Sequence, residues 1–138
     1  MSAPAESTRA RRGDLAVIVT EHHEYEIHDG HTRSLDYTTV ELYTTTNITR
    51  DGRVKAVRHV RYTDGPPVPL DRFLRSTTVH LIPADRIDVA AATEAARAHR
   101  WPHGDKYGPG TGDFMPFASL DEARQALRPH VYGAATTA

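Results

Sequence analysis

Basic side chains alternate along the stretch that follows Asp51-Gly52, the pattern of a strand that presents one face to phosphate. Alternate residues of a strand point to the same side of the sheet. Positive charges bind the phosphate backbone of a nucleic acid, and an aromatic ring can stack on an unpaired base. We therefore expect a nucleic-acid surface here, with Arg9, Arg11 and Arg12 adding a basic N-terminal arm. The residues of this predicted surface are Tyr43, Arg53, Lys55, His59 and Arg61.

Three potential metal ligands, Glu26, His28 and His31, surround the dipeptide Asp29-Gly30. Zinc accepts imidazole nitrogens and carboxylate oxygens, so these residue types could hold one ion at a turn. A metal-bound histidine is normally oriented by a hydrogen bond from its second ring nitrogen, and the sequence indicates no such partner. Arg33, expected opposite Glu26, also competes for its carboxylate. We therefore expect no bound metal and no cofactor.

Motifs for covalent or phosphate-transfer catalysis are weak in this chain. The sequence has no cysteine, which excludes disulfides, thiolate metal sites and a cysteine nucleophile. The glycines of residues 108–112 are not followed by the Lys-Ser or Lys-Thr pair of a phosphate-binding loop. Asp71, Ser76 and His80 have the residue types of acyl transfer but not the context of a nucleophile elbow. A metal-dependent enzyme is thus our third hypothesis, behind two binding functions.

Length and composition predict one small domain. The chain has 138 residues, 38% of them hydrophobic, and a formal net charge of -1. This length supports a single core, and the near-zero charge gives no general attraction to nucleic acid. We expect a disordered N-terminal arm over residues 1–13, one domain over 14–130 and a flexible tail over 131–138. The excess of Arg over Lys, with frequent Ala, Thr and Pro, indicates a bacterial or phage protein.

The N-terminal arginines precede no apolar run long enough for a signal peptide or a membrane helix. We therefore expect a cytoplasmic protein without a membrane partner.

Two Asp-Gly turns set the register of the first three strands. A two-residue loop at Asp29-Gly30 makes His28 oppose His31, and further along Val19 oppose Val40 and Val17 oppose Leu42. A three-residue loop at residues 50–52, with Gly52 in the left-handed conformation, aligns the third strand. The pairs it predicts are Ile48 with Val54, Thr46 with Ala56, and Leu42 with Val60. In this register one face is apolar and the other carries His, Glu, Tyr and Arg.

The remaining chain predicts one more strand and two helices. The proline-rich segment 63–70 is expected to be a loop, and residues 76–82 a strand with Val79 and Leu81 inward. A helix capped by Asp85 or Asp88 runs to about residue 99. The glycine- and proline-rich segment 101–116 is expected to be a mobile loop, followed by a helix from the capping box of Ser119.

These elements predict an α+β domain, a three- to four-stranded antiparallel β-meander, curled or partly closed into a barrel, with two short helices on one face. For function we expect a small non-catalytic binding or adaptor module associated with nucleic acid through the basic strand. The alternative is protein association, including formation of a homo-oligomer, through the polar sheet face or a sheet edge. Steep loss of binding with salt distinguishes the first from the second.

Overall fold

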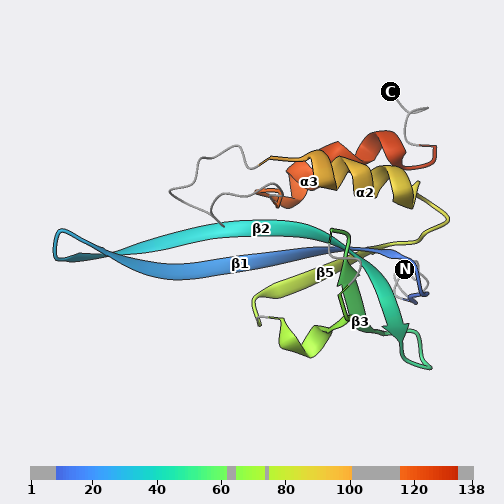
Figure 1. Ribbon diagram of the computed structural model, residues 1–138, viewed down its shortest axis with the longest axis horizontal. Coiled ribbons are helices and arrows are strands. Elements are labelled where there is room, and N and C mark those ends of the chain that lie inside the picture. The colour runs from blue at the N-terminus through green and yellow to red at the C-terminus, as the bar shows by residue number, and fades with distance from the viewer. Residues whose placement is uncertain (1–8, 62–64, 74, 101–115, 134–138) are drawn as a thin grey trace, which may run out of the picture.

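The computed structural model describes residues 9–61, 65–73, 75–100 and 116–133, except for the side chains of Glu26, His28 and Leu35. It contains a five-stranded antiparallel sheet in the order β4-β3-β2-β1-β5, with helices α2 and α3 on one face (Figure 1). The predicted α+β architecture is confirmed, and the sheet is open. Its elements are β1 (Leu15–His28), β2 (His31–Ile48), β3 (Val54–His59), β4 (Val68–Pro69), the 3-10 helix η1 (Leu70–Arg72), β5 (Thr77–Ile82), α2 (Val89–Ala98), α3 (Leu120–Leu127) and η2 (Arg128–His130).

The first hairpin has the predicted register along its whole length. Strands β1 and β2 pair from His28↔His31 at the turn to Leu15 at the far end, and Val17 opposes Leu42. Both turn residues have positive φ, 52° at Asp29 and 78° at Gly30. This is the geometry of a type I′ turn, whose twist matches that of the strands it joins.

The second hairpin confirms the predicted turn and most of the predicted pairs. Thr49 donates its backbone N–H to Arg53 O and closes the three-residue loop, in which Gly52 has φ +88°. The pair Ile48↔Val54 forms as predicted. A bulge on β2 then places Asn47, rather than Thr46, opposite Ala56, and the predicted register resumes beyond it.

The later strands correct two expectations. The fourth predicted strand forms as β5, but it pairs with β1, on the far side of the sheet from β3. The segment 63–70, predicted to be a loop, contains β4, in which Val68 pairs with Val57 and Pro69 with Ala56. Pro69 fits because β4 is an edge strand, where a missing backbone donor can face away from the ladder.

The helices begin at the predicted caps. The Asp88 side chain accepts the N–H of Ala91 at the start of α2, and the Ser119 side chain accepts the N–H of Glu122 at the start of α3. Each cap satisfies one of the backbone donors that a helix leaves unpaired. The buried residues are Ala92 and Ala96 in α2 and Ala123 and Leu127 in α3. Because three of the four are alanines, both helices pack closely on the sheet.

Two apolar clusters form, one on each face of the sheet. The cluster under the helices contains the predicted residues Val17, Val40, Leu42 and Val60, each at most 3% exposed, with Val19 at its margin. The prediction that the second face is polar is wrong over the body of the sheet. A second cluster covers it there and includes Ala16, Ile18, Tyr43 and Val57, packed by Leu70, Phe73, Val79 and Leu81. Val79 and Leu81 thus face this cluster rather than the helices.

The chain ends that the structure describes are packed on the domain. Residues 9–13, predicted to belong to a disordered arm, include Ala10, which donates its N–H to Gly52 O, and Gly13, which donates to Thr45 O. At the other end, Val131 pairs with Ile87 in an isolated bridge. Both of these segments therefore contact the body of the protein through backbone hydrogen bonds. The rest of the predicted N-terminal arm, of the predicted mobile loop and of the predicted C-terminal tail lies outside the described residues, at positions 1–8, 101–115 and 134–138.

Among the helices described, none is long and apolar enough to cross a membrane.

Candidate functional site

The first hairpin continues well beyond the strands that flank it. Strand β5 pairs with β1 as far as Thr20, and β3 pairs with β2 from Tyr43 onward. Farther out, seven residue pairs from His22↔Tyr37 to His28↔His31 form a ribbon of two strands. We call residues 22–37 the arm. At about 3.4 Å per residue it is roughly 20 Å long. Figure 1 shows it projecting from the body of the sheet.

The arm exposes two large apolar side chains. Tyr25 is 74% exposed and Ile27 is 79% exposed. Because side chains alternate along a strand, both lie on the face that bears Val17 and the helix-side core in the body of the sheet. A two-stranded hairpin is marginally stable in water by itself. Among the described residues, no layer therefore covers these two side chains.

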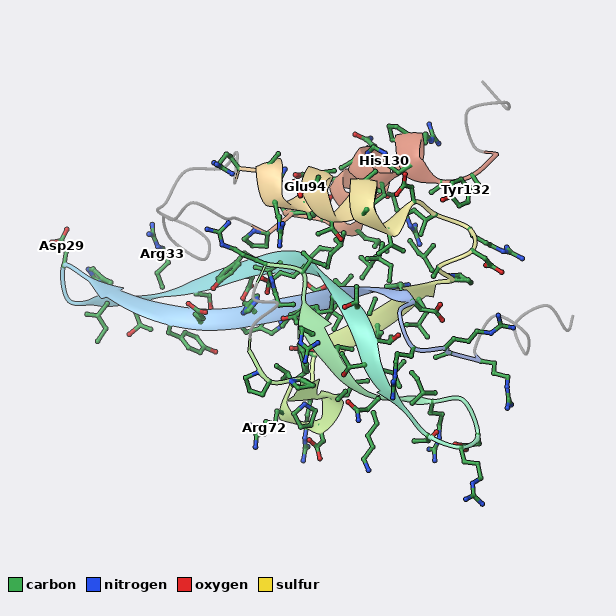
Figure 2. The ribbon with its side chains drawn as sticks, turned by 45° about the vertical axis from the view of Figure 1, so that its right-hand side comes forward. Asp29, Arg33, Arg72, Glu94, His130 and Tyr132 are labelled. Carbon is green, nitrogen blue, oxygen red and sulfur yellow. The ribbon has the colours of Figure 1, made fainter. Side chains whose placement is uncertain are left out.

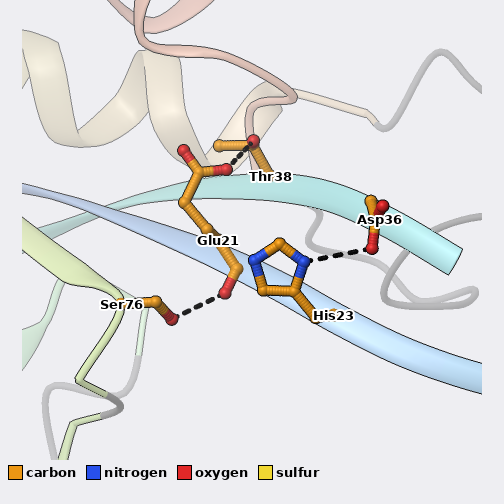
Figure 3. Close-up of polar contacts among 5 residues, drawn as sticks. All are labelled: Glu21, His23, Asp36, Thr38 and Ser76. Atoms are coloured by element: carbon orange, nitrogen blue, oxygen red, sulfur yellow. Dashed lines mark hydrogen bonds and ion pairs between the residues drawn. The ribbon is translucent and has the colours of Figure 1, made fainter. Parts of the chain in front are cut away.

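Hydrogen bonds of Glu21 and an ion pair of His23 lie at the base of the arm. Thr38 Oγ1 donates to Glu21 Oε1 at 2.7 Å, and Ser76 Oγ donates to the Glu21 backbone oxygen at 2.7 Å (Figure 3). His23 Nδ1 lies 3.0 Å from Asp36 Oδ1 across the two strands. Both of those side chains are about two thirds exposed, so this pair contributes little to stability.

On the opposite face of the arm, an aromatic stack crosses the two strands. The rings of His22 and Tyr37 lie 4.6 Å apart and nearly parallel. Tyr37 Oη donates to Glu24 Oε2 at 2.7 Å, and His22 Nε2 lies 2.7 Å from Thr39 Oγ1. Burial, followed by the hydrogen bond to the Glu24 carboxylate, raises the pKa of Tyr37 to about 12. The phenol is therefore held as a neutral donor that orders this face.

Two residues of the predicted nucleic-acid surface are buried. Tyr43 is 9% exposed and His59 is 7% exposed, and their rings meet edge to face at 4.8 Å. Phe73 also packs edge to face on Tyr43, with ring centroids 5.5 Å apart. The expectation that Tyr43 offers an exposed ring for base stacking is therefore wrong, because the segment after β4 folds over it.

A hydrogen-bond chain fixes the imidazole of His59. The backbone N–H of Arg61 donates to Nδ1 at 3.0 Å, so the hydrogen is on Nε2, which lies 2.9 Å from Glu41 Oε1. A buried polar ring normally needs such partners. His59 is thus buried beside Tyr43 of the second cluster, with both ring nitrogens already paired within the protein.

The other basic residues of the predicted surface remain accessible in part. Arg53 and Lys55 are exposed and Arg61 is half-buried. Arg53 Nε lies 3.1 Å from Asp51 Oδ2. The pKa of Asp51 is lowered, mainly by a hydrogen bond from the Thr49 hydroxyl to its carboxylate. The accessible basic surface beside the second turn is therefore smaller than the sequence predicts. It consists of Arg53, Lys55 and Arg61, which we call the basic strip.

The weak metal candidates lie at the tip of the arm. The backbone of Glu26 lies opposite Arg33 and that of His28 opposite His31, and the side chains of Glu26 and His28 lie outside the described part of the structure. Among the residues whose side chains are described, no group of three or more His, Asp or Glu is arranged to hold a metal ion.

Tyr25 and Ile27 are not among the surface residues predicted from the sequence. Their face could be read from the register, because Val17, Tyr25 and Ile27 are separated by even numbers of residues along one strand. What the sequence did not indicate is that the covering layer ends before the hairpin does.

Comparison with known proteins gives no relative on which to base a function. No protein-family model, curated protein or solved structure matches this chain.

Proposed function

We propose that this protein is a non-catalytic protein-association module and that its partner at the arm is a second copy of the same chain. The observation that carries the proposal is the seven-pair arm with Tyr25 and Ile27 exposed on one face. Burying a large apolar side chain contributes about 1.5–3 kcal/mol. Covering these two residues would therefore stabilise an element that is marginal by itself.

A second copy is the partner favoured by the backbone of the arm. Among the described residues, no third strand pairs with either outer edge of the arm. An unpaired strand edge presents a row of N–H and C=O groups that another strand can complete. A twofold contact between two arms would supply such a strand and bring two identical apolar patches together, as symmetric dimers do.

Sedimentation velocity over a range of protein concentrations tests this function. The wild type should show a monomer–dimer equilibrium, and a Tyr25→Thr, Ile27→Thr variant should raise its dissociation constant at least about a hundredfold, since every 1.4 kcal/mol is a factor of ten. Threonine keeps the preference for a strand. Tyr132→Thr is the matched control, because Tyr132 is also 62% exposed but lies at the C-terminal end of the described chain, away from the arm (Figure 2).

A monomeric wild type at all concentrations would exclude self-association. An equal effect of the arm variant and of Tyr132→Thr would show that the arm is not the contact surface.

Nucleic-acid binding through the basic strip is a second candidate function. It is supported by exposed Arg53 and Lys55, and by the side chain of Arg9, which lies over Gly52 in the neighbouring turn. Replacing Arg53, Lys55 and Arg61 by Ala should abolish binding to a mixed-sequence oligonucleotide, measured by fluorescence anisotropy. Wild-type binding should weaken with salt with a slope of about three counterions or fewer. No binding by the wild type at low salt would eliminate this function.

A further inference from the structure

A basic hollow lies at the end of the sheet opposite the tip of the arm. Its volume is about 340 Å³, and it is formed by the N-terminal segment and the turn that follows β5. Pro83 and Ala84 belong to its lining. The charged residues of the lining are Arg9, Arg11, Arg12, Asp14, Asp85 and Arg86. Of these residues, only Arg9 also belongs to the nucleic-acid surface proposed above, and the self-association surface uses none of them.

The backbone of the hollow is held by a buried carboxylate. Asp14 is 5% exposed, and its Oδ2 accepts the N–H of Arg11 at 2.8 Å while its Oδ1 accepts the N–H of Ala84 at 3.0 Å. One side chain thus ties together two segments that are 70 residues apart. Thr45 adds a second tie, since its Oγ1 donates to Arg11 O and accepts the N–H of Asp14. The positions from which the arginines project are therefore fixed.

The charge of the lining is not balanced. Four arginines face two carboxylates, which leaves a formal excess of two positive charges. Asp14 already accepts two backbone N–H groups, so it serves the fold. Within the described part of the chain, no ion pair joins Arg9, Arg11 or Arg86 to a carboxylate. Arg12 makes one neutral contact, from Nε to Thr46 O.

We propose that this hollow binds a phosphate group. A guanidinium presents several N–H donors in a planar fork that matches phosphate oxygens, and paired charge-assisted contacts of this kind are the strong ones. A phosphate dianion carries the charge that the lining lacks. Hollows of roughly 300–1,000 Å³ are the usual size for small-ligand sites. The group can come from a free phosphate or pyrophosphate, or from the diester backbone of a nucleic acid.

Isothermal titration calorimetry at low salt tests the site with three probes: inorganic phosphate, pyrophosphate and a mixed-sequence oligonucleotide. At least one should bind the wild type, and binding should weaken as chloride is added. An Arg11→Gln, Arg86→Gln variant should weaken that binding about tenfold for each guanidinium removed. The control is Arg72→Gln, Arg75→Gln, which removes the same charge from two exposed residues in and after η1 that do not line the hollow. Circular dichroism and the melting temperature establish that each variant is folded.

The outcomes separate the sources and decide the proposal. Binding of phosphate or pyrophosphate that is lost in the Arg11, Arg86 variant and kept in the control supports a site for a small phosphate compound. Binding of the oligonucleotide alone, with the same dependence, supports a site for the diester backbone. If none of the three probes binds, the proposal is wrong. It is equally wrong if both double variants weaken binding alike, since binding would then follow net charge rather than this hollow.

Discussion

Truncation of Leu42 measures how much of the stability depends on the cluster under the helices. Leu42 is fully buried, and its strand β2 has a neighbouring strand on each side. Leu42→Ala removes about three carbon atoms, which costs about 2.4 kcal/mol in transfer free energy at ~0.8 kcal/mol for each. A cavity term adds to this loss, because a central strand between two partners cannot move inward to fill the space. We therefore expect a loss of about 3–5 kcal/mol in the free energy of unfolding.

Urea denaturation followed by circular dichroism provides the measurement. Leu42→Ala should lower the midpoint with little change in the slope m, because the same surface is exposed on unfolding. A loss of ~3 kcal/mol corresponds to a decrease of about 10 °C in the melting temperature of a domain of this size. Tyr132→Ala is the control, since an exposed side chain should change stability by about 0.5 kcal/mol or less. A cost below ~1 kcal/mol for Leu42→Ala would refute the assigned register and core.

Three further predictions concern backbone strain and pH. Gly52→Val should lower the free energy of unfolding by about 1–3 kcal/mol, because Gly52 has φ +88° and an added Cβ would lie 2.7 Å from Arg9 Cγ. An unchanged melting temperature would contradict this prediction. Because the pKa of Tyr37 is raised to about 12, its contribution to stability is complete below pH 10 and is lost as the pH rises toward 12. In urea denaturation at increasing pH, Tyr37→Phe should not show this loss. Identical pH profiles of the urea midpoint for the variant and the wild type would contradict the prediction. Burial lowers the pKa of His99, so its contribution is present above about pH 6.5 and is lost as the pH falls through the lowered value. His99 Nε2 has no hydrogen-bond partner in the described structure, so His99→Leu should fold and show a smaller loss of stability in acid than the wild type.

Local sequence signals were sufficient for the hairpins and helix caps. The Asp29-Gly30 turn requires positive φ at both positions, and a two-residue loop then fixes every pair of the first hairpin. Asp88 and Ser119 begin the helices because their side chains satisfy backbone donors only a few residues away. Each of these features depends on neighbours in the chain, so each could be predicted without knowing the rest of the fold.

The candidate sites were harder to predict because exposure depends on distant segments. Tyr43 and Tyr25 are both aromatic residues on predicted strands, yet the first is buried by Phe73 and the second is exposed on the arm. The basic hollow likewise forms only because Asp14 holds the segment of Arg11 beside the turn that contains Ala84 and Arg86. Neither arrangement follows from the alternation of residues within a single strand.

The sequence by itself determined the pairs of the first hairpin and most of those of the second, because turn chemistry and the two-residue period of a strand are local constraints. Only the tertiary structure decided which parts of the sheet faces are covered. Placing β5 beside β1 and η1 over Tyr43 buried the second face of the body, and neither element reaches the arm. Burial is set by packing between segments far apart in the chain, and that packing determines which surface remains available for a partner.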